Sequence, residues 1–119
     1  MEALINAGGK GTRMGLCGIE KPMQVIGSEP AIHRVVTAVR GAAGIDRVLV
    51  SVSSHTQATE RYLQDLGVET VRTSGEDFMG DLHEAFTVMN GKYVFTCPSD
   101  IPLLTSPAVT QVVKAFDPV

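Results

Sequence analysis

Short apolar segments alternate with longer segments of helical pattern along this chain, and this alternation limits the fold more than any other feature. The apolar segments are Ala3–Asn6, Arg47–Val52, Val68–Arg72 and Lys92–Cys97. The segments of helical pattern are Pro30–Ala43, Thr56–Leu66, Phe78–Met89 and Ser106–Phe116. Strands separated by helix-length connections predict right-handed crossovers and a mostly parallel sheet. We therefore expect an α/β fold, a three-layer αβα sandwich around a Rossmann-like sheet.

The size and charge of the chain exclude several classes of protein. The 119 residues fit a single domain, and a hydrophobic fraction of 44% is enough for one core. The formal net charge is -3, whereas a dedicated nucleic-acid binder normally has a basic face. No apolar stretch approaches the roughly 18 to 20 residues that span a bilayer. Neither nucleic acid nor membrane is therefore expected as a partner, and any anion site must be local.

The two cysteines point to the compartment. Cys17 and Cys97 are far apart in sequence, and neither belongs to a C-x-x-C metal or redox motif. Two isolated thiols in a chain without a recognisable signal peptide are typical of a reducing environment. We expect a cytoplasmic protein.

A glycine-rich, cationic loop follows the first predicted strand. The segment Gly8–Gly15 contains four glycines, and Lys10, Arg13 and Lys21 add three cations in or shortly after it. Glycines let backbone amides approach a ligand without obstruction, and successive amides form a site for anions. The loop is therefore predicted to bind a polyphosphate. The alternative is a solvent-exposed turn whose cations only promote solubility.

Two familiar phosphate-binding motifs do not fit this loop. The P-loop requires G-x-x-x-x-G-K-[ST], but Lys10 is followed by Gly11 and the earlier glycine is missing. The dinucleotide fingerprint G-x-G-x-x-G can begin at Gly9, yet Met14 then stands at its last glycine position. A dinucleotide-dependent oxidoreductase is therefore disfavoured.

A second candidate site follows the fourth predicted strand. The segment Pro98–Pro102 reads PSDIP and carries Asp100. In parallel sheets, ligands bind beyond the carboxyl ends of the strands, so this segment and the glycine loop are expected to face one crevice. A carboxylate there suits Mg²⁺, which takes one or two protein carboxylates and completes its shell with water and phosphate oxygens. The alternative is that Asp100 only caps a turn or the next helix.

The combined pattern resembles a known family. Ala7–Gly15 followed by Lys21-Pro22 is similar to the signature loop of the NTP transferase superfamily, which includes the MobA-like molybdenum cofactor guanylyltransferases and sugar-1-phosphate nucleotidyltransferases. The further segments GIEKP, TSG (Thr73–Gly75) and DLHEA (Asp81–Ala85) look like the archaeal-type adenosylcobinamide-phosphate guanylyltransferases. The resemblance runs through essentially the whole chain and implies the nucleotide-diphospho-sugar transferase type of fold.

The resemblance implies a reaction and assigns roles to residues. GTP and adenosylcobinamide phosphate, a corrinoid phosphate, would give adenosylcobinamide-GDP and pyrophosphate in cobalamin biosynthesis. Arg13 and Lys21 would be the catalytic cations at the phosphates, and Asp100 would hold Mg²⁺. The nucleotide contacts would come from Ala7, Gly8, Gly9, Lys10, Gly11 and Thr12, with base or ribose contacts from Thr73, Ser74 and Gly75. For the last three, an ordinary helix-capping loop is an equal alternative.

Several alternatives stay open at this point. The acceptor could instead be molybdopterin or a sugar 1-phosphate, and a GTP-binding module without catalysis is a further option. Members of this superfamily usually run well beyond 119 residues, so residues 1–119 are expected to form the nucleotide-binding domain, with the acceptor-binding half largely lacking. A homodimer is neither indicated nor excluded by the sequence.

Overall fold

The computed structural model of the protein describes residues 1–8, 19–99, 101 and 103–116. Its strands are β1 (Glu2–Asn6), β2 (Val25–Ile26), β3 (Glu29–Pro30), β4 (Arg47–Val52), β5 (Glu69–Arg72) and β6 (Val94–Pro98). Its α-helices are α1 (Ala31–Arg40), α2 (Gln57–Asp65), α3 (Phe78–Phe86) and α4 (Ser106–Ala115). Within these residues, the short 3-10 helices η3 (Lys21–Met23) and η4 (Ser54–Thr56) precede α1 and α2.

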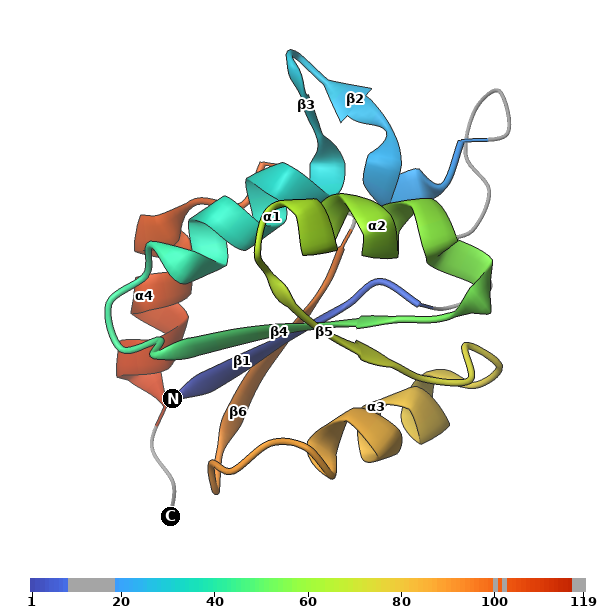
Figure 1. Ribbon diagram of the computed structural model, residues 1–119. Helices are drawn as coiled ribbons and strands as arrows, with labels where there is room; N and C mark the ends of the chain where they lie inside the picture. Colours follow the sequence, from blue (N-terminus) through green and yellow to red (C-terminus); the bar gives the residue numbers. More distant parts are fainter. Residues whose placement is uncertain (9–18, 100, 102, 117–119) are drawn as a thin grey trace.

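A four-stranded parallel sheet in the order β5-β4-β1-β6 forms the centre of the molecule (Figure 1). Ala3 of β1 pairs with Val48 on one side and Phe95 on the other. The chain moves outward from β1 through β4 to β5 and then returns to the far side of β1. Right-handed crossovers therefore place α1 and α2 on one face and α3 on the opposite face, as Figure 1 shows. The predicted three-layer αβα fold is confirmed.

The core divides into two clusters, one on each face of the sheet. The larger cluster contains alternate residues of β1 and β4, such as Ile5 and Val50, packed against buried side chains of α1, α2 and α4. The smaller cluster joins Leu4 and Leu49 to Ala85 of α3. This division follows from the geometry of strands, because successive side chains point to opposite faces. Helix α4 packs beside α1 on the more heavily covered face (Figure 1).

Several element bounds and one strand pair differ from the sequence-based expectation. The third predicted helix ends at Phe86, three residues early, and Phe86 is 43% exposed although the helical pattern places it on the buried face. Leu82 and Met89 do pack against the smaller cluster, as expected. The short antiparallel pair β2–β3 is not predicted by the sequence, because its residues Val25 and Ile26 are exposed and form no alternating pattern.

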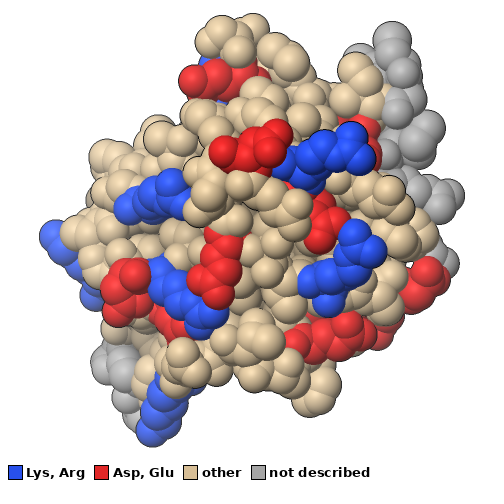
Figure 2. Space-filling view, viewed as in Figure 1, with Lys and Arg blue, Asp and Glu red and all other residues tan. Residues whose placement is uncertain are grey.

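The surface and the helices add two observations. Acidic and basic side chains are interspersed over the face shown in Figure 2 rather than gathered by sign, which matches the balanced composition. Among the described residues, no helix combines the length and apolar character that a membrane span requires.

Candidate functional site

The carboxyl ends of β1 and β6 form the point at which the order of the strands reverses. Asn6, the last residue of β1, pairs with Pro98, the last residue of β6. The chain passes from β1 outward to β4 and β5 and returns to β6 on the other side of β1. Open α/β sheets bind ligands beyond the carboxyl ends of the strands at such a point. The glycine loop begins after Asn6, and Asp100 is two residues beyond Pro98. The two candidate loops therefore start from neighbouring strand ends.

The backbone after β1 is held tightly against β4. The amide of Ala7 donates to the carbonyl of Ser51 at 2.9 Å, which extends the pairing by one residue. The side-chain oxygen of Asn6 accepts from the amide of Gly8 at 3.3 Å and from the hydroxyl of Ser51 at 3.1 Å. A Cβ atom on Gly8 would lie only 2.9 Å from the carbonyl carbon of Val52. Gly8 is thus required by the close approach of two backbones.

Ser53 connects the end of β4 with the start of the glycine loop. Its hydroxyl donates to the carbonyl of Gly8 and accepts from the amide of His55. Its amide donates to the hydroxyl of Thr56 at 3.1 Å, which completes a capping box on η4. Ser53 is fully buried, so its hydroxyl bonds within the protein rather than to a ligand, and it fixes the position of Gly8.

The segment after β5 reaches the same place. The amide of Thr73 donates to the carbonyl of Val52 at 2.7 Å, and Thr73 is buried. Gly75 has a φ of +73°, a conformation that favours glycine, and a Cβ there would lie 2.6 Å from the carbonyl oxygen of Gly8. The intervening Ser74 is exposed and its hydroxyl donates to Asp81. The structure thus brings together Ala7 and Gly8 with Thr73, Ser74 and Gly75.

Lys21 is positioned by its two neighbours. Glu20 accepts from the amides of Ala58 and Thr59 at 3.0 and 2.9 Å and from the Thr59 hydroxyl at 2.7 Å. The carboxylate therefore caps the start of α2, where negative charge is favoured. Pro22 on the other side is buried, while Lys21 itself is exposed. The chain is therefore fixed on both sides of the predicted catalytic lysine.

The other predicted site residues lie outside the described part of the chain. They are Gly9, Lys10, Gly11, Thr12, Arg13 and Asp100. Their roles remain predictions. The described residues give the positions of the strand ends that these segments follow.

The metal prediction can be tested only through the residues around Asp100. Within residues 1–8, 19–99, 101 and 103–116, no cluster of three or more acidic, histidine or cysteine side chains could hold a metal ion. Ser99, directly before Asp100, is fully buried, and its hydroxyl has no hydrogen-bond partner among these residues. A lone carboxylate with phosphate and water oxygens is a donor set that suits Mg²⁺. The chemistry of this segment therefore fits such an ion through Asp100.

Cys97 does not contribute a nucleophile. It is a free, buried cysteine, and burial raises the pKa of its thiol to about 12. Only the thiolate is nucleophilic, so this group stays unreactive near neutral pH. Cys97 instead lines a cavity of about 200 Å³ with Asn6, Leu82, Thr96 and Pro98 at the carboxyl ends of β1 and β6.

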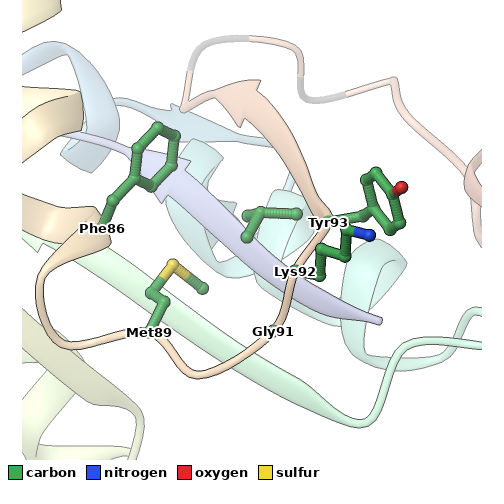
Figure 3. Close-up of a pocket in the computed structure, with 6 residues that line it drawn as sticks. Phe86, Met89, Gly91, Lys92 and Tyr93 are labelled. Carbon is green, nitrogen blue, oxygen red and sulfur yellow. The ribbon is translucent and has the colours of Figure 1, made fainter. Parts of the chain in front are cut away.

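A larger hollow lies at the amino end of the sheet, whereas the nucleotide is predicted to bind at the carboxyl end. It has a volume of about 340 Å³ and is lined by Phe86, Met89, Gly91, Lys92, Tyr93 and Val94. Figure 3 shows Phe86 and Met89 on one side of it and Lys92 and Tyr93 on the other. Because Gly91–Tyr93 precede β6, this hollow borders the amino end of the sheet, and we do not assign the nucleotide to it.

Sequence reasoning missed several residues that shape the site. Four residues hold the loops of the site in place but are not among the site residues that the sequence suggests: Asn6, Glu20, Ser53 and Asp81. A polar residue closing an apolar strand is the available signal for Asn6, and a serine directly after a strand is the signal for Ser53. Nothing local indicates the contacts of Glu20 and Asp81, because their partners are distant in sequence or in another element.

Comparison with known proteins places this site in context. The chain is 30% identical to the adenosylcobinamide-phosphate guanylyltransferase of Methanocaldococcus jannaschii over 98% of its length. It is 32% identical to the bifunctional protein GlmU of Carboxydothermus hydrogenoformans and 29% identical to the molybdenum cofactor guanylyltransferase of Ralstonia pickettii, each over 96% of its length. The chain spans 60%, 25% and 53% of these relatives, respectively.

Solved structures agree on the fold. A nucleotidyl transferase from Methanothermobacter matches with a TM-score of 0.83 at 22% identity, covering 98% of this chain and 57% of that one. A Mycobacterium tuberculosis protein in complex with manganese matches with a TM-score of 0.70 at 14% identity, covering 95% of this chain and 56% of that one. The MobA-like NTP transferase domain matches residues 3–119. With its signature loop and a parallel sheet that brings the neighbouring loops together, the chain belongs to the MobA-like NTP transferase family.

Proposed function

We propose that this chain is the nucleotide-binding part of a guanylyltransferase that transfers GMP from GTP to adenosylcobinamide phosphate. The observation that carries the proposal is the meeting of Gly8, Ser53 and Gly75 beyond the carboxyl ends of β1, β4 and β5. The choice of nucleotide and acceptor is supported by the match to the Methanocaldococcus jannaschii guanylyltransferase over 98% of the chain.

The proposed chemistry needs positioning and charge neutralisation rather than a general base. A phosphate monoester is largely dianionic near neutral pH, since its second pKa is about 6. One of its oxygens attacks the α-phosphorus of GTP, the bond to the oxygen that bridges the α- and β-phosphates breaks, and pyrophosphate leaves. Arg13 and Lys21 would offset the negative charge that builds up on the departing pyrophosphate. The backbone from Ala7 to Thr12 would hold the triphosphate in line.

A divalent cation belongs to this proposal. Mg²⁺ held by Asp100 would supply further charge neutralisation of the triphosphate when bound. The match to a manganese complex of the same fold and the donor set around Asp100 support a divalent cation. The free thiol of Cys97 supports a reducing, cytoplasmic setting.

Two other functions remain candidates on specific observations. The GlmU and molybdenum cofactor relatives favour a sugar 1-phosphate or a molybdopterin as acceptor. The chain spans only 60% of the adenosylcobinamide-phosphate guanylyltransferase, which favours GTP binding without turnover by residues 1–119.

Nucleotide titration and product analysis separate these functions. We expect calorimetry to show that GTP binds more tightly than ATP or CTP, and that Asp100→Asn removes the contribution of Mg²⁺. Pyrophosphate release with adenosylcobinamide phosphate, but not with molybdopterin or a sugar 1-phosphate, would identify the acceptor. Binding of GTP without pyrophosphate release from any acceptor would indicate the non-catalytic module. Absence of GTP binding would contradict the proposal.

Arg13→Ala gives a sharper test of the catalytic assignment. Loss of an electrostatic donor at developing charge typically lowers turnover on the order of a hundredfold or more. We expect such a loss at saturating GTP, with the circular dichroism spectrum and melting temperature unchanged. A near-normal rate would remove Arg13 from the mechanism.

A further inference from the structure

Asp81 makes contacts that its helix does not need. Helix α3 is capped by Asp77, whose carboxylate accepts from the amide of Gly80 at 3.1 Å. Asp81 is one turn further on and only 1% exposed. Its Oδ1 atom accepts from the amide of Gly75 at 2.9 Å and from the hydroxyl of Ser74 at 3.2 Å. A carboxylate in the first turn is favoured by the helix dipole, but these bonds are directed at the loop after β5.

The loop that Asp81 holds presses on the other two loops of the site. At Gly75 there is no room for a side chain, because a Cβ would lie 2.5 Å from the Ser53 hydroxyl and 2.6 Å from the Gly8 carbonyl oxygen. That hydroxyl in turn donates to the Gly8 carbonyl. We call Gly8, Ser53, Ser74, Gly75 and Asp81 the loop clasp. It joins the segments that leave β1, β4 and β5 to the start of α3.

The burial of Asp81 indicates that these contacts have a purpose. A carboxylate taken out of water is unfavourable unless hydrogen bonds compensate it. Only one of its oxygens is compensated, since Oδ2 is buried without a hydrogen-bond partner among the described residues. An apolar side chain at this position would avoid the cost but could not hold Ser74 and Gly75. The stability of α3 alone therefore does not account for Asp81.

We propose that Asp81 is a positioning residue that, through the loop clasp, holds the start of the glycine loop in the arrangement that binds the nucleotide. The effect on the nucleotide rests on the function proposed above, whereas the effect on the three loops does not. Asp81 acts through Gly75 and Ser53 on Gly8, and it does not itself contact the nucleotide.

Three variants test this role. Asp81→Ala removes both hydrogen bonds that Asp81 accepts from this loop and leaves the one from the Ser74 amide to Glu84. We expect the dissociation constant for GTP to rise on the order of tenfold, the factor for one hydrogen bond to a charged group. Turnover at saturating GTP should stay within about twofold, because the reacting groups are untouched. Asp81→Asn keeps an oxygen that can accept from both donors, so it should restore near wild-type affinity. Asp77→Ala removes only the helix cap and should lower the melting temperature without weakening GTP binding.

Hydrogen exchange of the free protein separates this inference from the proposed function. Asp81→Ala should speed exchange not only in the segment 74–76 but also at the amides of Gly8 and His55, whereas Asp77→Ala should not. Faster exchange confined to 74–76 would overturn the proposal, even if wild-type protein binds GTP. Failure of wild-type protein to bind GTP would instead overturn the proposed function, while the exchange data would still decide whether the clasp exists.

Binding data on the variants can also exclude a positioning role. If Asp81→Asn binds GTP as poorly as Asp81→Ala, the charge itself is needed, and Asp81 acts directly on the ligand. If Asp81→Ala binds GTP as tightly as wild type, the clasp has no effect on the nucleotide. Should Asp81→Ala not fold, Ser53→Ala breaks the clasp at its other end and should weaken GTP binding in the same way. Unchanged binding in that variant would also overturn the proposal.

Discussion

At the scale of single residues, Gly8 shows how tightly the described side of the site is built. A methyl group there would meet backbone atoms, the carbonyl carbon of Val52 at 2.9 Å and the amide nitrogen of Ser53 at 3.2 Å. Val52 is the last residue of β4 and pairs with Arg72 of β5, so this backbone cannot move aside easily. We expect Gly8→Ala to lower the free energy of unfolding by about 1 to 3 kcal/mol, the range for overpacking. Urea denaturation measures this loss, and the dissociation constant for GTP should rise in parallel.

Gly67 provides the matched control. It has a φ of +75°, but nothing lies within 4 Å of the position that an alanine methyl group would occupy. Gly67→Ala therefore introduces only backbone strain, about 1 kcal/mol, and is far from the site. Unchanged GTP binding in Gly8→Ala, or GTP binding weakened equally in Gly67→Ala, would contradict the role assigned to Gly8.

The sequence could predict a loop glycine at position 8 but not the reason for it. The notion that glycines expose amides to a ligand applies to the whole loop, whereas Gly8 is required by its contact with β4. The same holds for Gly75, which the resemblance assigns to the base or ribose and which is required by its contact with Gly8 and Ser53. Tertiary contacts between three loops leave no local pattern in a single sequence.

At the scale of elements, the order of strands and helices was predictable because each has a clear period. Apolar residues of Ala31–Arg40 recur at helical spacing, and the run Arg47–Val52 is rich in β-branched residues. The role of Glu20 was not predictable in this way. In the sequence it is only part of a family motif, although the structure shows that it caps α2 from a distant segment.

The cap formed by Glu20 leads to a prediction about α2 and Lys21. Glu20→Ala leaves two amides at the start of α2 without their acceptor, so the free energy of unfolding should fall by about 1 kcal/mol. Lys21 would lose its anchor, and GTP binding should weaken as well. Asp65→Asn is the control, because it removes the same charge from the other end of α2. Thermal unfolding and GTP titration of both variants check this, and a Glu20→Ala protein that matches Asp65→Asn in both would contradict it.

At the scale of the whole molecule, the two ends of the parallel sheet differ. The loops at the carboxyl end meet around Gly8, while the amino end has a network of charges centred on Arg47, here called the amino-end network. Arg47 of β4 donates to Glu2 of β1 at 2.6 Å, to Glu69 of β5 at 3.0 Å and to the carbonyl of Val88 at 3.1 Å. Glu2 also accepts from the amide of Asn90 at 2.7 Å. This network ties three strands and the turn before β6 together, away from the site.

The amino-end network makes the stability of the molecule depend on pH in the acidic range. Hydrogen bonds from Arg47 lower the pKa of Glu2 and of Glu69 below their ordinary values, against the opposing effect of burial. A carboxylate whose pKa is lowered on folding adds stability above its ordinary pKa, about 4.3, and this stability is lost as the pH falls through the lowered value. Arg47→Met removes the main cause of both shifts, although the amides of Gly91 and Asn90 still lower the pKa of Glu2. Its deficit in stability against wild type should therefore be largest near neutral pH and shrink as the pH falls from about 6 to about 3.

Urea denaturation at a series of pH values measures that deficit, with Asp46→Asn as the control. Asp46 lies at the same end of the sheet and pairs with the N-terminal amine at 3.4 Å, but its side chain is 75% exposed. Exposed pairs contribute little because water and salt screen them, so Asp46→Asn should differ little from wild type at any pH. A deficit of Arg47→Met that stays constant down to pH 3 would mean that Arg47 stabilises the sheet by packing its aliphatic stem rather than through Glu2 and Glu69. A deficit that shrinks as the pH falls would instead mean that charge interactions hold this end of the sheet together. A loss of packing does not depend on the protonation of a carboxylate.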